Sequence, residues 1–95
     1  MFEISLAEGG SIVLSGRFDA AQVDRAKAVF DKLTSTTSVD FARLDYISSA
    51  GLGVLMATHK RLSAKGEKLK LKNVTGHIRD VFRIARFDLI FEIEQ

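Results

Sequence analysis

The feature that most constrains the fold is a strict alternation of charged and apolar residues at positions 68–72, which read Lys-Leu-Lys-Leu-Lys. This period of two is typical of a β-strand that buries one face and exposes the other. A parallel strand covered by helices on both faces would instead be apolar throughout. The chain is therefore expected to build a sheet whose helices lie on one face only.

The segments around this strand predict a chain in which strands and helices alternate. Residues 2–6 and 12–14 flank the turn residues Gly9 and Gly10, which indicates a hairpin that ends at Gly16. Apolar residues at helical spacing predict helices over residues 19–33, 52–62 and 75–85. Gly66 is expected to end the second helix, and Thr75 to cap the third. Residues 39–42 and 91–94 predict two more strands, and a loop through Ile47 is expected to lead into the second helix.

The predicted order is ββαβαβαβ. Right-handed crossovers that move in one direction across a sheet place their helices on the same face, which agrees with the alternation at residues 68–72. At 95 residues, the chain has room for one core. The expected fold is therefore a single α/β domain over residues 1–95, with a mixed sheet of four to five strands and the main helices on one face.

Composition narrows the classes of function. The chain has no cysteine, which fits a reducing cytoplasm, and no stretch approaches the roughly 20 apolar residues of a membrane-spanning helix. Its start shows no export signal, so a cytoplasmic location is expected. The net charge is only +2, and the basic residues are spread among twelve acidic ones. Direct binding to nucleic acid, which favours a concentrated basic face, is therefore not expected.

Positions 48–53 read Ser-Ser-Ala-Gly-Leu-Gly and fall where the chain is expected to enter the second helix. A serine at a helix start can cap the first turn, and a phosphate there would face free N–H groups and the positive end of the helix dipole. Gly51 and Gly53 each cost about 1 kcal/mol relative to alanine in a helix, so something is expected to approach this backbone closely. The pattern indicates a modified or docking surface, with Leu52 and Val54 as further contacts.

Asp19 has two interpretations, because it follows a strand and precedes a helix. It can cap that helix in a capping box with Gln22, or it can flank the serines, since partner sites gather at the carboxyl ends of parallel strands. The arginines at positions 79, 83 and 86 fall on the outward side of the third helix. They indicate a solvated face, with a docking patch as the alternative.

The sequence offers no catalytic residue and no metal site. His59 lies about 15 Å along the second helix from Ser49, too far to act as its base, and a packed or half-exposed histidine is expected. His77 has no partner at metal-ligand spacing. Neither a dinucleotide fingerprint nor a Walker motif is present, so no cofactor is expected and the chain is predicted not to be an enzyme.

These motifs together resemble the STAS domain, and within it the bacterial anti-sigma factor antagonists. Residues 47–53 are similar to that family's motif of a hydrophobic residue, Asp, Ser, a small residue, Gly and Leu. Residues 14–19 resemble its Leu-x-Gly-x-hydrophobic-Asp segment, and residues 69–74 resemble its fourth strand and exit. The resemblance covers essentially the whole chain. It departs from the family at Ser48, where the motif usually has aspartate.

The resemblance implies a partner-binding module controlled by phosphorylation. In these antagonists the unphosphorylated domain binds an anti-sigma factor that is also a serine kinase, phosphorylation breaks the complex, and a serine phosphatase restores it. By position, the phosphorylated residue is Ser49, with Ser48 as second choice. The partner-binding residues implied are Asp19, Ser48, Ser49, Gly51, Leu52, Gly53 and Val54.

Two other functions remain open. The chain could be a STAS subunit of a larger assembly, such as a lipid-transport complex or a stressosome-like scaffold, that docks a partner without phosphorylation. It could also bind a small ligand or nucleotide at the strand-end loops, although no specific set of polar residues supports that interpretation.

Overall fold

The computed structural model describes residues 1–94. The five strands are β1 (Phe2–Leu6), β2 (Ile12–Phe18), β3 (Thr37–Ile47), β4 (Leu69–Lys72) and β5 (Glu92–Glu94). The three α-helices are α1 (Val23–Phe30), α2 (Ser49–Ser63) and α3 (Gly76–Ile84). Short 3-10 helices are η1 (Glu8–Gly10), η2 (Ala20–Gln22) and η3 (Phe87–Leu89). The predicted order of strands and helices is confirmed.

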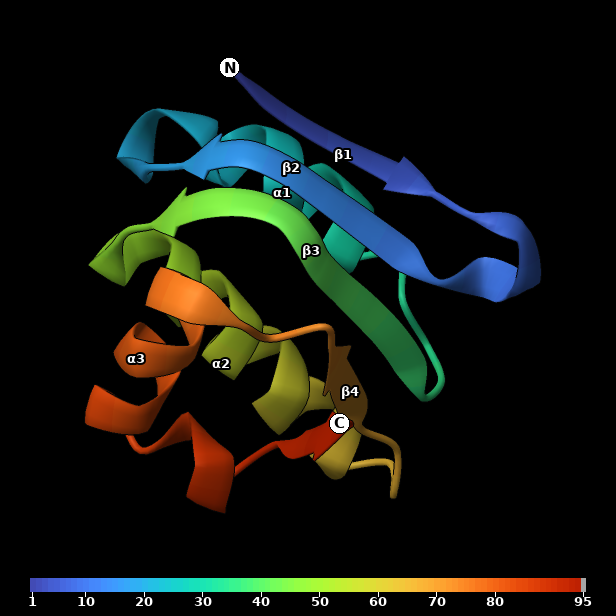
Figure 1. Cartoon of the computed structure of the whole chain (residues 1–95). Coiled ribbons are helices and arrows are strands. Elements are labelled where there is room, and N and C mark those ends of the chain that lie inside the picture. Colours follow the sequence, from blue (N-terminus) through green and yellow to red (C-terminus); the bar gives the residue numbers. More distant parts are fainter. Residues whose placement is uncertain (95) are drawn as a thin grey trace.

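The strands form one mixed sheet in the order β1-β2-β3-β4-β5 (Figure 1). β1 runs antiparallel to β2, and the other neighbouring strands are parallel. Because each parallel strand lies next to its predecessor, every crossover moves in the same direction. The carboxyl ends of β2 and β3 therefore meet at one end of the sheet, where Phe18 is in register with Ile47.

The helices cover one face of the sheet, as the alternation predicted. Alternate residues of the central strands are buried in a single core, which includes Ile12, Leu14, Val39, Phe41, Leu69 and Leu71. The residues between them on the other face are only half-buried, among them Val13, Ser15, Asp40, Lys70 and Lys72. The ring of Phe82 in α3 meets that of Phe41 edge-on, with 5.2 Å between their centroids. The opposite face thus stays open to solvent.

β3 is longer than the sequence predicts, because it continues from residue 42 to Ile47 where a loop was expected. Two irregularities in its register with β2 explain the difference. Each places an extra residue in β3, which keeps Leu44 and Ile47 buried on the core side even though they break the simple alternation. The serines therefore follow a strand directly.

The sequence predicts that the hairpin ends at Gly16. In the structure, Gly16 lies inside β2. Its φ angle is +81°, and a Cβ atom there would lie 1.5 Å from the carbonyl oxygen of Met1. Only glycine permits this conformation together with this approach of the N-terminal strand. The residue marks close packing between β1 and β2 rather than a turn.

The predicted helix signals have mixed outcomes. Gly66 adopts the left-handed conformation after α2, with Glu67 N–H donating to the Leu62 carbonyl at 2.9 Å, so the predicted termination is confirmed. Thr75 occupies the N-cap position of α3, but its side chain makes no capping hydrogen bond. Arg61 of α2 is half-buried. It donates to the carbonyl oxygens of Phe30 and Leu33, at 2.8 Å each, and so ties the end of α1 to α2.

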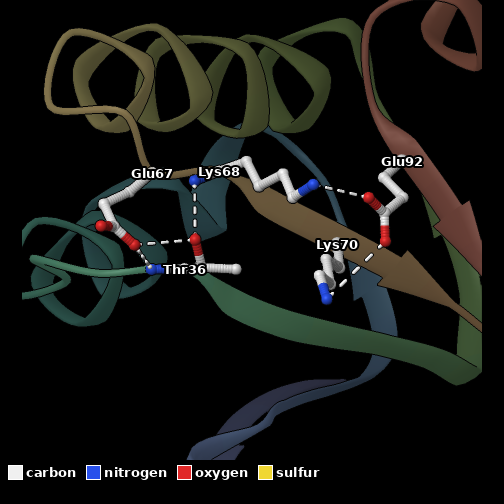
Figure 2. A network of polar contacts seen from close by, with 5 residues as sticks. All are labelled: Thr36, Glu67, Lys68, Lys70 and Glu92. Carbon is white, nitrogen blue, oxygen red and sulfur yellow. Dashed lines mark hydrogen bonds and ion pairs between the residues drawn. The ribbon is translucent and has the colours of Figure 1, made fainter.

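A polar network joins the segment before β3 to β4 and β5 (Figure 2). The Glu67 carboxylate accepts hydrogen bonds from the Thr36 amide (2.7 Å) and hydroxyl (2.8 Å), and the same hydroxyl accepts from the Lys68 amide. Lys68 Nζ lies 2.7 Å from Glu92, and Lys70 Nζ lies 3.7 Å from it. Hydrogen bonds from Thr36 hold the pKa of Glu67 below its ordinary value, and the hydrogen bond from Lys68 does the same for the pKa of Glu92.

Candidate functional site

The junction between β3 and α2 is a tight strand-to-helix turn built around Ser48. Ser48 is the N-cap of α2, and its hydroxyl oxygen accepts a hydrogen bond from the Gly51 N–H at 3.2 Å. Its own N–H donates to the Phe18 carbonyl oxygen at 2.9 Å. Ser48 is half-buried, so its hydroxyl is already engaged in holding the helix start.

Ser49 is the first residue of α2, and its side chain is exposed. Within residues 1–94, the N–H groups of Ser49 and Ala50 have no hydrogen-bond partner, as expected for the first turn of a helix. These donors and the helix dipole give the site a partial positive charge. An anionic group attached to the Ser49 hydroxyl would therefore meet a favourable local field.

The two glycines of the motif have different surroundings. Gly51 is buried, and a Cβ atom there would lie 2.8 Å from Ile47 Cγ1 and 3.1 Å from Phe18 Cγ. The close approach expected at Gly51 is thus made by the domain's own core, so Gly51 offers no exposed edge to a partner. Gly53 is exposed, and a Cβ atom there would meet nothing within 4 Å.

The predicted docking surface is narrower than the sequence indicated. Leu52 is half-buried. Val54 is only 7% exposed and packs into the core, because it lies on the side of α2 that faces the core. The accessible part of the motif consists of Ser49, Leu52 and Gly53. We call these three residues the serine surface.

A shallow groove of about 250 Å³ begins beside the serine surface and runs between α1 and α2. One wall consists of Ala50, Gly53, Val54 and Ala57 of α2, and the other of Val23 and Lys27 of α1 and of Asp31, which follows α1. The small side chains of α2 leave this groove open. Val54 therefore contributes a wall of the groove rather than a projecting contact.

Asp19 lies beside the serine turn, because it follows Phe18 directly and Phe18 receives the Ser48 N–H. Its carboxylate accepts from the Ala21 N–H at 3.1 Å and caps η2, which contacts α2. In a capping box, the Gln22 side chain would also accept from the backbone N–H of Asp19. It accepts from the Arg25 side chain instead. Asp19 therefore caps η2 without forming the predicted capping box, and it lies beside the serine turn.

Sequence reasoning gave no role to Arg17 and Tyr46, which are neighbours in register at the same end of β2 and β3. The Arg17 guanidinium carbon lies 4.3 Å from the centroid of the Tyr46 ring, and the arginine is exposed. They lie on the open face, one register position before Phe18 and Ile47. Their pairing depends on the irregular register of β3, which no local pattern reveals.

The remaining candidates lie away from the serine surface. The His59 ring packs against Phe91, with 4.6 Å between centroids, which confirms the expected packed histidine. Arg79 and Arg83 are exposed and line a pocket of about 320 Å³ together with Asp88. Among residues 1–94, no group of three or more potential ligands is placed to hold a metal ion. None of the helices described is both long and apolar enough to cross a membrane.

The fold is similar to solved structures that are named as anti-sigma factor antagonists. Unphosphorylated SpoIIAA aligns over 100% of this chain and 88% of its own, with a TM-score of 0.72 and 20% identity. The phosphorylated form of SpoIIAA from Bacillus aligns with a TM-score of 0.71, over 92% of its own chain. A Thermotoga maritima protein named as an anti-sigma factor antagonist aligns with a TM-score of 0.81 and 20% identity. The alignment covers 100% of this chain and 86% of that protein. At this identity, the likeness concerns the fold.

Sequence comparisons then identify the family. A family model described as "Mlab, STAS domain" matches residues 4–92. BtrV of Bordetella bronchiseptica, named as an anti-sigma factor antagonist, is 39% identical over 74 residues, which are 78% of this chain. The chain spans 58% of the length of that relative. This chain belongs to the STAS-domain family.

Proposed function

We propose that this chain is an anti-sigma factor antagonist, which binds an anti-sigma factor with serine kinase activity and releases it when Ser49 is phosphorylated. The proposal rests on the different surroundings of the two serine hydroxyls. The Ser48 hydroxyl is half-buried and caps α2, whereas Ser49 is exposed on the first turn. A kinase would therefore find the Ser49 hydroxyl free and the Ser48 hydroxyl occupied.

The departure from the family motif at position 48 fits this difference. Serine and aspartate are about equally good N-cap residues, so Ser48 keeps the capping function that aspartate would perform. It removes only the negative charge beside Ser49. The departure therefore concerns how a kinase recognises the site and leaves the local structure that presents Ser49 unchanged.

The proposed switch acts at the interface rather than on the fold. A phosphate at a helix N-terminus stabilises the helix by roughly 0.3–1 kcal/mol, so phosphorylation of Ser49 would leave the domain folded. A charge buried against a partner without compensation costs roughly 2–5 kcal/mol, which is about 30-fold to several thousand-fold in affinity. A partner seated on the serine surface would be expelled by that cost.

The partners in this proposal are the kinase and a serine phosphatase that resets the site. The chain itself contributes a surface rather than catalysis. The role would be exercised in the bacterial cytoplasm, where sigma factors meet RNA polymerase. Asp19, which flanks the serine turn, and the groove between α1 and α2 extend the contact area beyond the three residues of the serine surface.

Binding of Ser49 variants tests the proposal. The probe is the anti-sigma factor with a serine-kinase domain that is encoded nearest to this chain in its genome, and affinity is measured by titration calorimetry. Ser49→Asp should weaken binding at least 30-fold, whereas Ser49→Ala should bind about as tightly as the native chain. Ser35→Asp places the same charge on an exposed loop and serves as the matched control. Equal affinity of folded Ser49→Asp and native chain would refute the switch.

A second function is favoured by the missing aspartate at position 48. In this alternative, the chain is a STAS subunit of a larger assembly, such as a lipid-transport complex or a stressosome-like scaffold. The serine surface then docks its partner constitutively. A complex that forms equally well with and without ATP, while no phosphate is added to the chain, would favour this function over the switch.

A further inference from the structure

β1 is the outermost strand of the sheet, and its free side carries backbone groups ready to pair. The Arg17 N–H donates to the Met1 carbonyl oxygen at 3.0 Å, and the register places Phe2 opposite Gly16. In an antiparallel ladder, hydrogen-bonded and non-hydrogen-bonded pairs alternate. Met1 and Arg17 form a hydrogen-bonded pair, so the next pair, Phe2 and Gly16, is of the non-hydrogen-bonded kind. Bonding to β2 therefore alternates, and the backbone groups of Phe2, Ile4 and Leu6 point away from β2.

One end of this free side is already covered. Arg25 in α1 donates to the Phe2 carbonyl oxygen at 3.1 Å, and its guanidinium lies over the Phe2 ring at 5.8 Å. Within residues 1–94, the N–H and C=O groups of Ile4 and Leu6 on this side have no hydrogen-bond partner. β1 carries no lysine or proline, which are residues that natural edge strands commonly use to prevent pairing.

The side chains next to these free groups are apolar. Leu6 is 67% exposed, although it lies on the core side of β1. Ile4 and Leu6 line a groove of about 430 Å³ with Val29 of α1 and with Lys32 and Leu33, which follow α1. Exposed apolar surface beside an open strand edge is characteristic of an interface that forms by strand addition.

We propose that β1 pairs antiparallel with β1 of a second copy of this chain, about a two-fold axis that passes between the two Ser5 residues. Ile4 of each copy then lies opposite Leu6 of the other, and the two residues exchange N–H···O=C hydrogen bonds in both directions. This register uses the free groups of Ile4 and Leu6 and leaves the Phe2–Arg25 bond intact. It also places the two apolar grooves against each other and covers both Leu6 side chains.

The occupant is a second copy because the free segment complements itself. Ile4 and Leu6 each offer one donor and one acceptor on the same edge, so a two-fold rotation matches the four groups of one chain to those of the other. An unrelated strand running the full length of β1 would compete with Arg25 at Phe2. Glu3 falls opposite Ala7 of the second copy, so the register brings no like charges face to face.

Sedimentation equilibrium of the native chain over a wide range of concentration tests the proposal, with circular dichroism as the check on folding. The native chain should dimerise, and Leu6→Lys should abolish the dimer while keeping the fold, since this side chain projects into solvent in the single domain. Ile84→Lys makes the same change at another exposed apolar residue, 82% exposed on α3, and should leave the dimer intact. A native chain that stays monomeric at all concentrations, or a dimer unaffected by Leu6→Lys, would overturn the proposal.

A cysteine on the proposed axis tests the register. The two Ser5 residues would form a non-hydrogen-bonded pair with Cα atoms about 4.5 Å apart, within the range of a disulfide. The chain has no cysteine of its own, so Ser5→Cys should give a single disulfide-linked dimer on oxidation. Glu3→Cys places the two sulfurs about 14 Å apart along the strands and should not cross-link. Equal cross-linking of both variants, or none at Ser5→Cys, would contradict this arrangement.

Discussion

The backbone N–H of Ser48 donates to the carbonyl oxygen of Phe18 at 2.9 Å, and this bond fixes the start of α2 against the end of β2. Phe18 and Ile47 are in register, so the residues that follow them, Asp19 and Ser48, emerge side by side. The motif thus has a structural half and an accessible half. Ser48 and Gly51 build the turn, while Ser49 and Gly53 face solvent.

The cap at Ser48 should be measurable as stability. Ser48→Ala removes the acceptor of the Gly51 N–H and should lower the free energy of unfolding by about 1 kcal/mol. Ser48→Asp should retain the native stability, because aspartate caps equally well and its charge suits the helix dipole. Urea unfolding of both variants checks this. A Ser48→Ala variant as stable as the native chain would show that the cap contributes little, and a loss in Ser48→Asp as large as in Ser48→Ala would show that aspartate does not replace the serine cap.

The two glycines of the motif should respond in opposite ways to the same change. Gly51→Ala forces a methyl group against Ile47 and Phe18 and should destabilise the domain by about 1–3 kcal/mol. Gly53→Ala meets open space and should stabilise α2 by about 0.5–1 kcal/mol. Thermal unfolding of the pair provides the comparison, with each variant as the control for the other. Similar effects at both positions would contradict the packing described for Gly51.

Arg61 should contribute more to stability than its place on a helix surface suggests. Arg61→Ala removes two hydrogen bonds to the carbonyl oxygens of Phe30 and Leu33 and should cost about 1–3 kcal/mol. Lys60→Ala, at the exposed position next to it, should change stability by less than about 0.5 kcal/mol. The measurement is the urea midpoint of each variant. Equal effects would mean that the contact between α1 and α2 does not depend on Arg61.

The network around Glu67 should make stability depend on pH. Hydrogen bonds from Thr36 lower the pKa of Glu67 from 4.5 in the folded chain, so its contribution to stability is present above pH 4.5 and is lost as the pH falls through the folded-state pKa. Glu67→Gln should therefore reduce the decline of the melting temperature on acidification. Glu8→Gln provides the control, since Glu8 makes no side-chain hydrogen bond within residues 1–94. An unchanged acid profile in Glu67→Gln would contradict this account.

The fold could be predicted because its signals are local. Alternation at residues 68–72 and apolar spacing in three helices depend on neighbours in sequence, and a right-handed connection converts them into one covered face. The extension of β3 to Ile47 could not be predicted in this way. Its register shifts interrupt the alternation, and only pairing with β2 shows which residues are buried.

The candidate site was predictable in its position but not in the roles of its residues. The motif located the helix start, and the expected proximity of Asp19 and the serines follows from parallel strands ending together. Glycine in sequence does not reveal whether a partner or the protein's own core approaches it. At Gly51 the core makes this approach, through Phe18, which lies 33 residues earlier in the sequence. Arg17 and Tyr46 were missed for the same reason, because their contact crosses between strands.

The most direct test of the proposed switch is intact-mass spectrometry with site mapping, after incubation with ATP and the serine-kinase anti-sigma factor encoded nearby. We predict a single added phosphate on Ser49, its retention in Ser48→Ala and its loss in Ser49→Ala. Absence of phosphate on the native chain, together with a complex that is stable with or without ATP, would contradict the switch and favour a constitutive docking subunit.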